Sequence, residues 1–495
     1  MSSFLLGIDQ GTSGSRALLI DQAGQVHGYA HVPLARLYPQ PDWVEQDPEA
    51  VAAGVLGAIT AVLQQTNLSP RDIAACGLTC QRNTDFVWDS QTGQPIANAI
   101  TWQDLRTLPL LDELAAWPLA DQIRPRLGYP AAPYMSALHL AWRMRHDAAV
   151  QEAARNGRLR IGQSAAWLIR RLGQPSGHVM DTSLVQASGL YDIQARAYWP
   201  AWCEWLGIAP AALPQPVPTL YQFGHLLLDG HPIPVTATIG DQQAALFGHG
   251  CRQPGDSEIT HGTGSYVKLF VGDSMAAPEL VDLLCAWDIG QGQTYCLEAQ
   301  TTVSGAGLRW LREELGLFAD YDQIDALAGS VPDNGGVCFV PAFTGLNVPY
   351  NNRHARATLL GLTLGSQRGH IMRAFLEALG LQIEAILRAV ETAVPHPPRQ
   401  LLVGGGITAS DMACQLQADL TGLPVRRPAF TEASAYGAAL LAGLGVGVWR
   451  NAAALPRPPG GHTLFAPMMT DDVRETAVAR WQKAIQVVAA FSPQQ

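Results

Sequence analysis

The stretch LLGIDQGTSGSRALLID, residues 5–21, predicts two apolar strands joined by a polar turn. Asp9 falls where the first strand ends, and Arg16 follows the turn. Backbone N–H groups and hydroxyls at such a tip form a nest for anions, and a neighbouring carboxylate holds Mg²⁺ directly or through water. The segment therefore predicts a β-hairpin that handles phosphate and its metal ion.

Length and composition limit the class of protein. The chain has 495 residues, which predicts two or three domains, and 47% hydrophobic residues supply their cores. The start has no basic region before its short apolar runs, so we expect no signal peptide, and no window reaches the roughly 18 apolar residues of a membrane span. We expect a soluble, cytoplasmic protein without membrane insertion. The net charge of −10 argues against a nucleic-acid partner.

Cysteine and lysine narrow the chemistry. The eight cysteines are scattered, and Cys76 and Cys80 have no second pair to complete a zinc site, so we expect buried free thiols. Lysine occurs only as Lys268 and Lys483, and neither lies in a G-K-[ST] or V-A-I-K motif. A Walker A loop and a protein kinase are therefore excluded. Phosphate must be held by backbone amides, hydroxyls, arginine and metal.

A second hairpin is predicted in the sequence SEITHGTGSYVKLFVGD, residues 257–273, which again places Gly-Thr and Ser between apolar strands. We interpret the pair as an internal repeat of two related domains, although turns favour these residues in any hairpin. Strand and helix patterns alternate along the chain, which indicates an α/β protein. A Gly-rich stretch at 246–256 is suited to a hinge between the two domains.

Further elements are predicted downstream. The sequence LLVGGGITAS, residues 401–410, predicts a strand and a glycine turn before a helix, an arrangement suited to contact with a nucleotide. Residues 137–155 predict one helix and residues 472–491 a final helix. The small residues of 433–447 favour a helix that packs tightly rather than one that performs chemistry.

The order of motifs resembles the FGGY carbohydrate kinases, most closely their glycerol kinase branch. The motifs cover nearly the whole chain: IDQGTSGSR, YPQPDWVEQDP, QRNTDFVWDSQTGQPIANAITWQDLRT, GDQQAALFG, HGTGSY, VPAFTGLNVPY, GLTLG and GGGITAS. The resemblance implies two actin-like (ribonuclease H-like) α/β domains, 1–248 and 249–495, flanking a catalytic cleft. The first would bind the polyol or sugar and the second ATP, with Mg²⁺ as cofactor, and we expect a homo-oligomer, a dimer or a tetramer.

The resemblance also implies residue roles. Asp241 matches the general base, which takes the proton of the attacking hydroxyl; without the resemblance an N-cap aspartate is the simpler interpretation. Asp9 matches the acid that organises Mg²⁺. The positions that match phosphate-loop or nucleotide-side residues are Thr12, Ser13, Arg16, Gly262, Thr263, Gly264, Gly305, Arg309, Gly405, Gly406 and Asp411. Arg309 stands where glycerol kinases usually have glutamine.

The acceptor side departs from the glycerol kinase pattern. Matching acceptor-contacting positions are Arg82, Asn83, Trp102, Tyr134, Asp241, Gln242 and Tyr266. Taken alone, Trp102 and Tyr134 would be core or surface aromatics. Asn83 replaces a glutamate, and a neutral hydrogen bond contributes about 1 kcal/mol where a charged one contributes roughly 1.5–3 kcal/mol. His139 replaces a lysine, and Gly404 an aspartate.

Three functions remain open from the sequence. The first is an ATP- and Mg²⁺-dependent kinase that phosphorylates a terminal hydroxyl of a small polyol, glycerol above all. The second keeps the chemistry but acts on a ketose or on a four- or five-carbon polyol of the xylulose, ribulose or erythritol type. The third is a non-catalytic actin-like protein that binds nucleotide, which would need no hydroxyl-activating base.

Overall fold

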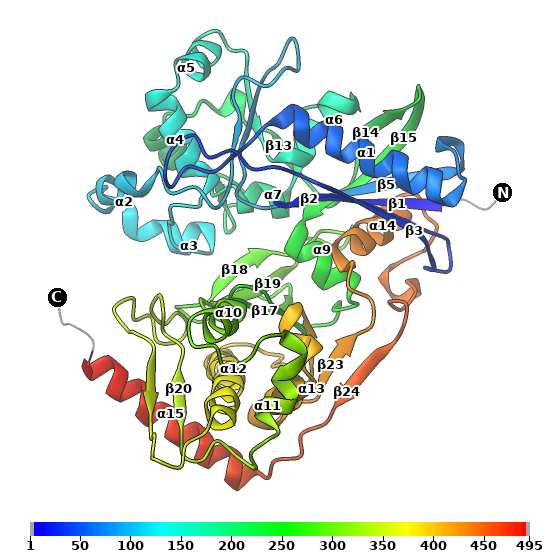
Figure 1. Ribbon diagram of the computed structural model, residues 1–495. Helices are drawn as coiled ribbons and strands as arrows, with labels where there is room; N and C mark the ends of the chain where they lie inside the picture. The colour runs from blue at the N-terminus through cyan, green and yellow to red at the C-terminus, as the bar shows by residue number, and fades with distance from the viewer. Residues whose placement is uncertain (1–3, 492–495) are drawn as a thin grey trace. The chain divides into compact units, whose positions relative to one another are not determined.

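The computed structural model describes residues 4–491, and the chain forms two compact units (Figure 1). Unit 1 holds the described residues up to Arg252, together with Leu284–Tyr295 and Glu432–Pro459. Unit 2 holds Gln253–Leu283, Cys296–Thr431 and the described residues from Gly460 onward. The units therefore interleave along the sequence, and the expected domain limits 1–248 and 249–495 stay a prediction.

Unit 1 is built on a seven-stranded sheet in the order β3-β2-β1-β5-β15-β14-β9. The predicted hairpin is confirmed: β1 (Phe4–Gln10) pairs antiparallel with β2 (Gly14–Ile20), and the Gly11 N–H donates to the Gly14 carbonyl at 2.9 Å. Strand β1 also pairs parallel with β5 (Ile73–Cys80), which pairs parallel with β15 (His231–Gly240). The other strands are β3 (Val26–Pro33), β14 (Leu220–Leu228) and β9 (Gly173–Pro175).

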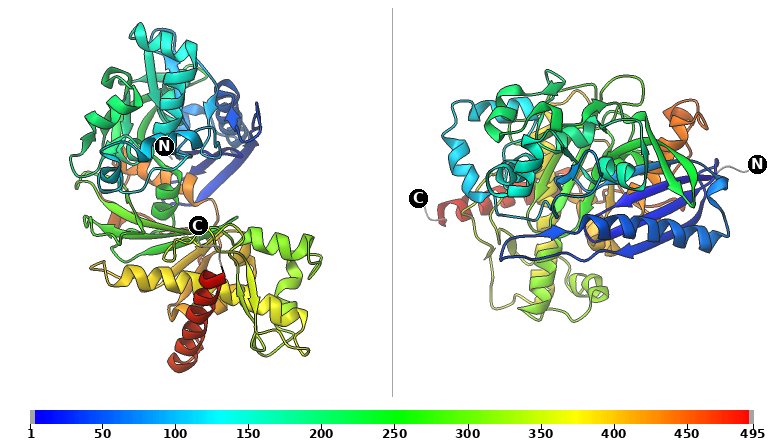
Figure 2. Two further views of the ribbon diagram at one scale, coloured as in Figure 1. Left: turned by 90° about the vertical axis from the view of Figure 1, so that its left-hand side faces the viewer. Right: turned by 90° about the horizontal axis from the view of Figure 1, so that it is seen from above.

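Two helices pack on the hairpin strands of this sheet. Helix α1 (Pro48–Thr66) packs on β2 and β3, and α14 (Ala433–Gly445) packs on β1 and β5 (Figures 1 and 2). A Cβ added to Gly7 would lie 1.9 Å from the Ala435 carbonyl oxygen, and one added to Gly77 would lie 2.0 Å from that of Ala438. The backbones thus approach too closely for any side chain, which confirms the predicted packing role of the small-residue helix.

A largely helical segment lies between β5 and β14 in the sequence. Its elements before β9 are β6 (Phe86–Asp89), β7 (Ala99–Ile100), α2 (Leu108–Ala115), α3 (Ile123–Leu127), α4 (Ser136–His146), α5 (Ala148–Arg155), β8 (Leu159–Gly162) and α6 (Ser164–Leu172). The prediction of one helix over 137–155 is wrong. Asp147 has an extended backbone, and its carboxylate accepts hydrogen bonds from the Ala149 and Val150 N–H groups, so it begins a second helix.

Unit 2 repeats the plan of unit 1. Its sheet has the order β18-β19-β17-β16-β22-β23-β24, and the predicted hairpin is confirmed as β16 (Ser257–His261) and β17 (Ser265–Gly272). Strand β16 pairs parallel with β22 (Leu401–Gly404), just as β1 pairs with β5. A hairpin whose first strand pairs parallel with a later strand in each unit supports the internal repeat and the α/β class.

The remaining elements of unit 2 complete its core. Helix α12 (Arg368–Glu391) packs against α13 (Asp411–Thr421) and α15 (Asp471–Phe491), as Figure 2 shows in yellow to red. The other elements are β18 (Asp282–Cys285), β19 (Tyr295–Thr301), α10 (Gly305–Glu313), α11 (Ile324–Ala328), β20 (Cys338–Val340), β21 (Thr358–Leu360), β23 (Val425–Pro428) and β24 (His462–Phe465).

Two composition-based expectations bear on the whole chain. All eight cysteines are buried and free, as predicted. Within residues 4–491, no helix combines the length and apolar character needed to cross a bilayer.

Candidate active site

Asp241 is the first residue of α9 (Asp241–Gly248), directly after strand β15. The Arg82 Nε atom lies 3.8 Å from its Oδ1 atom, and the Gln242 N–H donates to the same oxygen at 2.7 Å. The helix N-terminus and the guanidinium both favour the charged carboxylate. Asp241 therefore combines a stabilised negative charge with a side chain that is about one quarter exposed, at 24%.

Asp9 is the last residue but one of β1 in the same unit, and its charge and that of Asp241 influence each other. Burial raises the pKa of Asp9 to about 7; Arg16 opposes this rise, and the charges of Asp241 and Glu432 add to it. The Arg16 Nη1 atom donates to Asp9 Oδ2 at 3.4 Å, and Arg16 Nε lies 3.5 Å from a Glu432 carboxylate oxygen. Two carboxylates and an arginine thus gather around the hairpin tip.

One atom of Asp9 fits a metal ion. Its Oδ1 atom is buried and has no hydrogen-bond partner among the described residues. Such an oxygen suits Mg²⁺, which usually takes one or two protein carboxylates and completes its shell with water and substrate phosphates. Between residues 4 and 491 there is no cluster of three or more His, Cys, Asp or Glu side chains that would bind a metal alone. The donor set therefore fits a metal that arrives with phosphate.

Thr12 links the hairpin tip to the predicted acceptor side. Its hydroxyl accepts a hydrogen bond from Trp102 Nε1 at 2.9 Å and donates to Gln81 Oε1 at 2.8 Å. Trp102 is 39% exposed, so it is a surface ring that a polar contact orients rather than a core residue. Ser13 is exposed beside Thr12.

The other acceptor-side residues of unit 1 lie near these groups in the sequence or on adjoining strands. Arg82 and Asn83 form an elbow after β5, and Asn83 has a left-handed backbone with φ of 56°. The Asn83 Oδ1 atom is buried and has no hydrogen-bond partner among the described residues. Tyr134 precedes α4 and is half-buried. The amide oxygen of Asn83 is therefore available to a donor such as a substrate hydroxyl.

In unit 2, the tip Gly262–Gly264 is tied to the start of α10. The Gly305 N–H donates to the Gly262 carbonyl at 2.9 Å. Gly405 has φ of 94°, and a Cβ there would lie 2.1 Å from the His261 carbonyl oxygen, so only glycine fits. The tip, α10 and the glycine turn after β22 thus form one connected support, to which Thr263 also belongs.

The remaining predicted residues of unit 2 have varied surroundings. Tyr266 lies on β17 opposite Thr260 and is half-buried, while Arg309 on α10 and Gly406 are exposed. Asp411 forms an ion pair of 2.8 Å with Arg427 at the start of α13. The Asp325 carboxylate already accepts the Asp411 N–H at 2.9 Å, so the α13 N-terminus has a carboxylate in the place where a phosphate would bind.

Several site groups were not predicted from the sequence. Glu432, which faces Arg16, stands far from the hairpin in the sequence and belongs to no phosphate motif. His261 joins the hairpin to the rest of unit 2: its Nδ1 atom is 2.7 Å from Ser265 Oγ and its Nε2 atom is 2.8 Å from Gln417 Oε1. Its place beside the Gly-Thr-Gly tip was the only available signal.

Known proteins resemble this chain along nearly its whole length. Residues 4–248 match the N-terminal domain of the FGGY family of carbohydrate kinases, and residues 258–446 match its C-terminal domain. A glycerol kinase of Symbiobacterium thermophilum is 40% identical over 487 residues, 98% of each chain. The structure of Plasmodium falciparum glycerol kinase with ADP has a TM-score of 0.92 at 26% identity and 98% coverage of both chains.

More distant proteins share the fold of this chain. A xylulose kinase from Rhodospirillum rubrum has a TM-score of 0.87 at 23% identity, with 99% of each chain covered. The predicted fold class of two actin-like α/β domains and the predicted enzyme class of a phosphotransferase that acts on alcohol groups are both confirmed. The chain belongs to the FGGY family of carbohydrate kinases.

Proposed function

We propose that this protein transfers the γ-phosphoryl group of ATP to a terminal hydroxyl of glycerol, giving glycerol 3-phosphate and ADP. The observation that carries the proposal is the pairing of Asp241 with Arg82, 3.8 Å apart, in the unit that also holds Asp9 with its unpartnered oxygen. The identity of 40% with a glycerol kinase over nearly the full chain supports glycerol as the acceptor.

The residues would divide the chemistry as follows. The Asp241 carboxylate takes the proton of the acceptor hydroxyl. The hydroxyl oxygen bonds to the γ-phosphorus of ATP, and the bond between the γ-phosphorus and the β–γ bridging oxygen breaks, which releases ADP. Arg82 and Asn83 would hold the acceptor hydroxyls, and Trp102 and Tyr134 of the same unit would cover its C–H faces. When bound, Mg²⁺ held by Asp9 and the phosphates would neutralise charge on the phosphate oxygens.

The nucleotide belongs to unit 2 in this proposal. The backbone of Gly262–Gly264, the start of α10 at Gly305 and the turn at Gly405 and Gly406 would receive ATP, with Arg309 near its base. In unit 1, Thr12, Ser13 and Arg16 of the β1–β2 hairpin would offer hydroxyls and a guanidinium that suit phosphate. Asp411 would act through its ion pair with Arg427, 2.8 Å long, rather than by touching phosphate. The expected homo-oligomer stays a prediction.

A second acceptor class is favoured by one residue. Asn83 is shorter than the glutamate of glycerol kinases and neutral, so it makes room for a ketose or a four- or five-carbon polyol and both donates and accepts hydrogen bonds. The left-handed backbone at Asn83, with φ of 56°, suits asparagine better than most residues.

An ADP-release assay over an acceptor panel tests the proposal. The purified chain is assayed with ATP and Mg²⁺ against glycerol, dihydroxyacetone, erythritol, xylulose and ribulose. We expect saturable turnover with glycerol and the highest kcat/KM for it. Saturable turnover with another acceptor and none with glycerol would establish the second class instead. ADP release that no acceptor accelerates would contradict both and favour a nucleotide-binding protein without kinase activity.

A further inference from the structure

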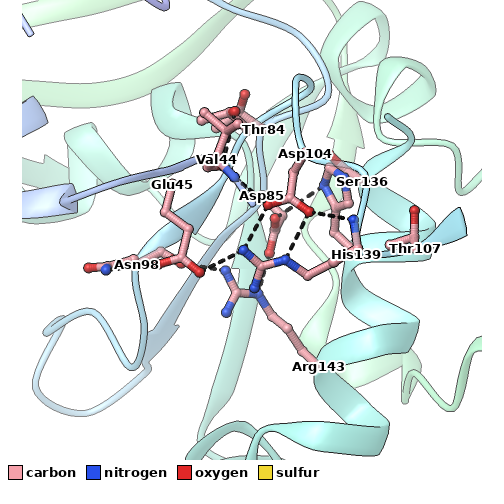
Figure 3. Close-up of polar contacts among 12 residues, drawn as sticks. Val44, Glu45, Thr84, Asp85, Asn98, Asp104, Thr107, Ser136, His139 and Arg143 are labelled. Atoms are coloured by element: carbon pink, nitrogen blue, oxygen red, sulfur yellow. Dashed lines mark hydrogen bonds and ion pairs between the residues drawn. The ribbon is translucent and has the colours of Figure 1, made fainter. Parts of the chain in front are cut away.

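Three segments of unit 1 carry the proposed acceptor contacts, and a polar network joins them, all of it buried except the half-buried Glu45 and Asn98 (Figure 3). The segments are the elbow 81–85 with Arg82 and Asn83, the loop 101–107 with Trp102, and residues 133–146 with Tyr134. We call the connecting side chains the acceptor network; its members are Glu45, Asp85, Asn98, Asp104, Arg106, His139 and Arg143. None of them is among the proposed acceptor contacts.

Asp85 joins the elbow to α4. Its Oδ2 atom accepts from Arg143 Nε at 2.5 Å, and its Oδ1 atom lies 3.5 Å from His139 Nδ1. All three residues are at most 2% exposed. Burial would raise the pKa of Asp85, but Arg143 and His139 together hold it below its ordinary value, so the carboxylate stays charged. The Asp85 N–H also donates to the Ile100 carbonyl at 3.1 Å, which fixes the elbow from a second side.

The network continues from α4 to the loop that bears Trp102. Arg143 Nη2 donates to the Asn98 carbonyl, and Asn98 Nδ2 donates to Glu45 Oε2 at 3.0 Å. Arg106 then bridges Glu45, at 2.7 Å, and Asp104, at 2.8 Å. Asp104 and Arg106 belong to the loop itself, so the chain of contacts reaches it without a break.

The loop and the approach to α4 are also bonded directly. The Thr107 hydroxyl donates to the Pro133 carbonyl at 2.7 Å, one residue before Tyr134. Gln163 connects the elbow to the start of α4 a second time. Its Oε1 atom accepts from the Thr84 N–H at 3.2 Å, and its Nε2 atom lies 3.3 Å from Ser136 Oγ. Each of the three segments is therefore connected to both of the others.

Buried charges are a costly way to fill a core, since apolar residues of the same volume often stabilise it as well or better. What charges provide is geometry, because every buried charge must keep its partner at hydrogen-bond distance. The Arg82–Asn83 elbow benefits from such support, because the left-handed backbone at Asn83, with φ of 56°, is less favourable than the helical or extended regions even for asparagine.

We propose that Asp85 and Arg143 are positioning residues that set acceptor selectivity, by holding the Arg82–Asn83 elbow in register with Trp102 and Tyr134. The inference rests on the proposed function, which assigns these four residues to the acceptor. Loss of the pair would weaken acceptor binding and blur the choice between acceptors. It would change the affinity for ATP much less, because the nucleotide-side support of unit 2 shares no residue with the network, and Thr12 is the proposed phosphate contact that bonds to Gln81 of the elbow and to Trp102 of the loop.

The test removes both charges at once, so that neither remains buried without a partner. The double variant D85N/R143Q is compared with the control R126Q/D192N, which removes an ion pair of 2.6 Å elsewhere in unit 1. We expect the KM for the acceptor to rise about tenfold or more in D85N/R143Q, as misplaced contacts would cause. The KM for ATP should stay within about twofold, and the preference among acceptors of the panel should fall about tenfold. The control should leave both KM values and the preference among acceptors unchanged.

Hydrogen exchange supplies a readout that needs no acceptor. In D85N/R143Q, amides of 81–88, 99–107 and 131–142 should all exchange faster, while the control leaves these three segments unchanged. The proposal is overturned if the folded variant keeps the wild-type acceptor KM and preference, if both KM values rise equally, or if only one segment exchanges faster. If the proposed function is wrong, the wild-type chain will phosphorylate no acceptor. Hydrogen exchange of the three segments would still show whether Asp85 and Arg143 hold them in place.

Discussion

The hairpins β1–β2 and β16–β17 hold equivalent places in their sheets but carry different side chains at their tips. In unit 1, Asp9 stands across from Arg16, and one of its carboxylate oxygens is buried without a partner among the described residues. In unit 2, His261 stands across from Ser265 and bonds to it at 2.7 Å, and Ser265 lies 2.5 Å from Ser304 at the start of α10. The first tip presents charge, and the second pairs its neutral polar groups with one another.

The charged residues of the second hairpin also pair with each other. Lys268 and Glu258 face each other across β16 and β17 at 2.7 Å and are at most 2% exposed. Their charges offset each other inside the sheet and do not reach the tip. The two equivalent hairpins thus differ in chemistry: the tip of unit 1 carries a carboxylate oxygen without a partner among the described residues, and the tip of unit 2 is held by hydrogen bonds among neutral groups.

The largest expected effect comes from unit 1, whose hairpin tip carries charge. Asp241→Asn removes the proposed base but keeps the size of the side chain, so kcat should fall by about 10²–10⁴-fold. ATP affinity should stay within about twofold, because no negative charge is needed to hold the nucleotide. Steady-state kinetics and ATP binding measured by calorimetry check both.

Asp47→Asn is the matched control. Asp47 caps α1 by accepting the Glu49 N–H at 2.9 Å, so its substitution changes a capping carboxylate away from the proposed chemistry. Its kcat should match the wild type. Near-wild-type kcat in Asp241→Asn would reduce Asp241 to an ordinary helix-terminal aspartate.

The second effect concerns the neutral tip of unit 2. Burial lowers the pKa of His261 from 6.5 to about 4, so the folded protein keeps the ring neutral where the unfolded chain already binds a proton. Stability should therefore be unaffected by His261 above pH 6.5 and should fall as pH drops from 6.5 towards 4, by up to about 3 kcal/mol. Urea unfolding at several pH values measures this loss.

His261→Gln isolates the contribution, because glutamine offers a donor and an acceptor but does not titrate in this range. As pH falls from 6.5 to 4, the free energy of unfolding of the wild type should decrease relative to that of the variant. A constant difference across that range would show that the ring is not held neutral in the folded protein. His178 in unit 1, whose pKa burial also lowers to about 4, should titrate alike in both proteins.

The third effect tests the unpartnered oxygen of unit 1. Asp9→Asn replaces a carboxylate ligand by an amide, so the Mg²⁺ concentration needed for half-maximal activity should rise about 10- to 100-fold. Excess Mg²⁺ should restore part of kcat. Activity titrations with Mg²⁺ at saturating ATP provide the measurement.

Asp21→Asn serves as its control at the other end of the same hairpin. Asp21 accepts the Ala23 and Gln25 N–H groups at 2.8 and 3.0 Å in an exposed turn. The variant should keep the wild-type Mg²⁺ requirement. Equal Mg²⁺ curves for Asp9→Asn and the wild type would remove Asp9 from the metal site.

Much of this contrast was predictable from local sequence. The two hairpins, the strand before Asp241 and the small-residue helix that packs tightly all follow from apolar runs and small residues along the local sequence, but the partners of that helix, Gly7 and Gly77, do not. The motif order then identified the family. What local patterns do not encode is pairing across long separations, such as Arg16 with Glu432 or Asp85 with Arg143.

One local error, over residues 137–155, and one contact that local patterns do not show, at Asp411, have the same origin. The apolar spacing of 137–155 continues through Asp147, and only the hydrogen bonds of its carboxylate reveal that one helix ends and another begins there. Likewise, Asp411 lies near the glycine turn in sequence, yet Asp325 from α11 accepts its N–H and Arg427 pairs with its side chain. In both cases the contacts of polar side chains, rather than the apolar pattern, set the local structure.

The smallest expected effect lies in the bond between the unit 1 hairpin and the acceptor side. Trp102→Phe keeps an aromatic face but removes the Nε1–H that donates to Thr12 at 2.9 Å. Loss of one neutral hydrogen bond should lower kcat/KM for the acceptor by about fivefold, equivalent to ~1 kcal/mol. Thr12→Val should have a comparable or somewhat larger effect, since it also loses the bond to Gln81.

The double variant decides whether the two residues act together. If the Trp102–Thr12 bond couples the acceptor to the phosphate hairpin, Trp102→Phe should cost little more once Thr12 is valine, so the combined loss in kcat/KM would be about that of Thr12→Val alone. Thr12→Ser, which retains the hydroxyl, should restore the sensitivity to Trp102→Phe. Losses that simply multiply would mean that the ring and the hydroxyl serve the reaction independently, and the hairpin of unit 1 would then be as self-contained as that of unit 2.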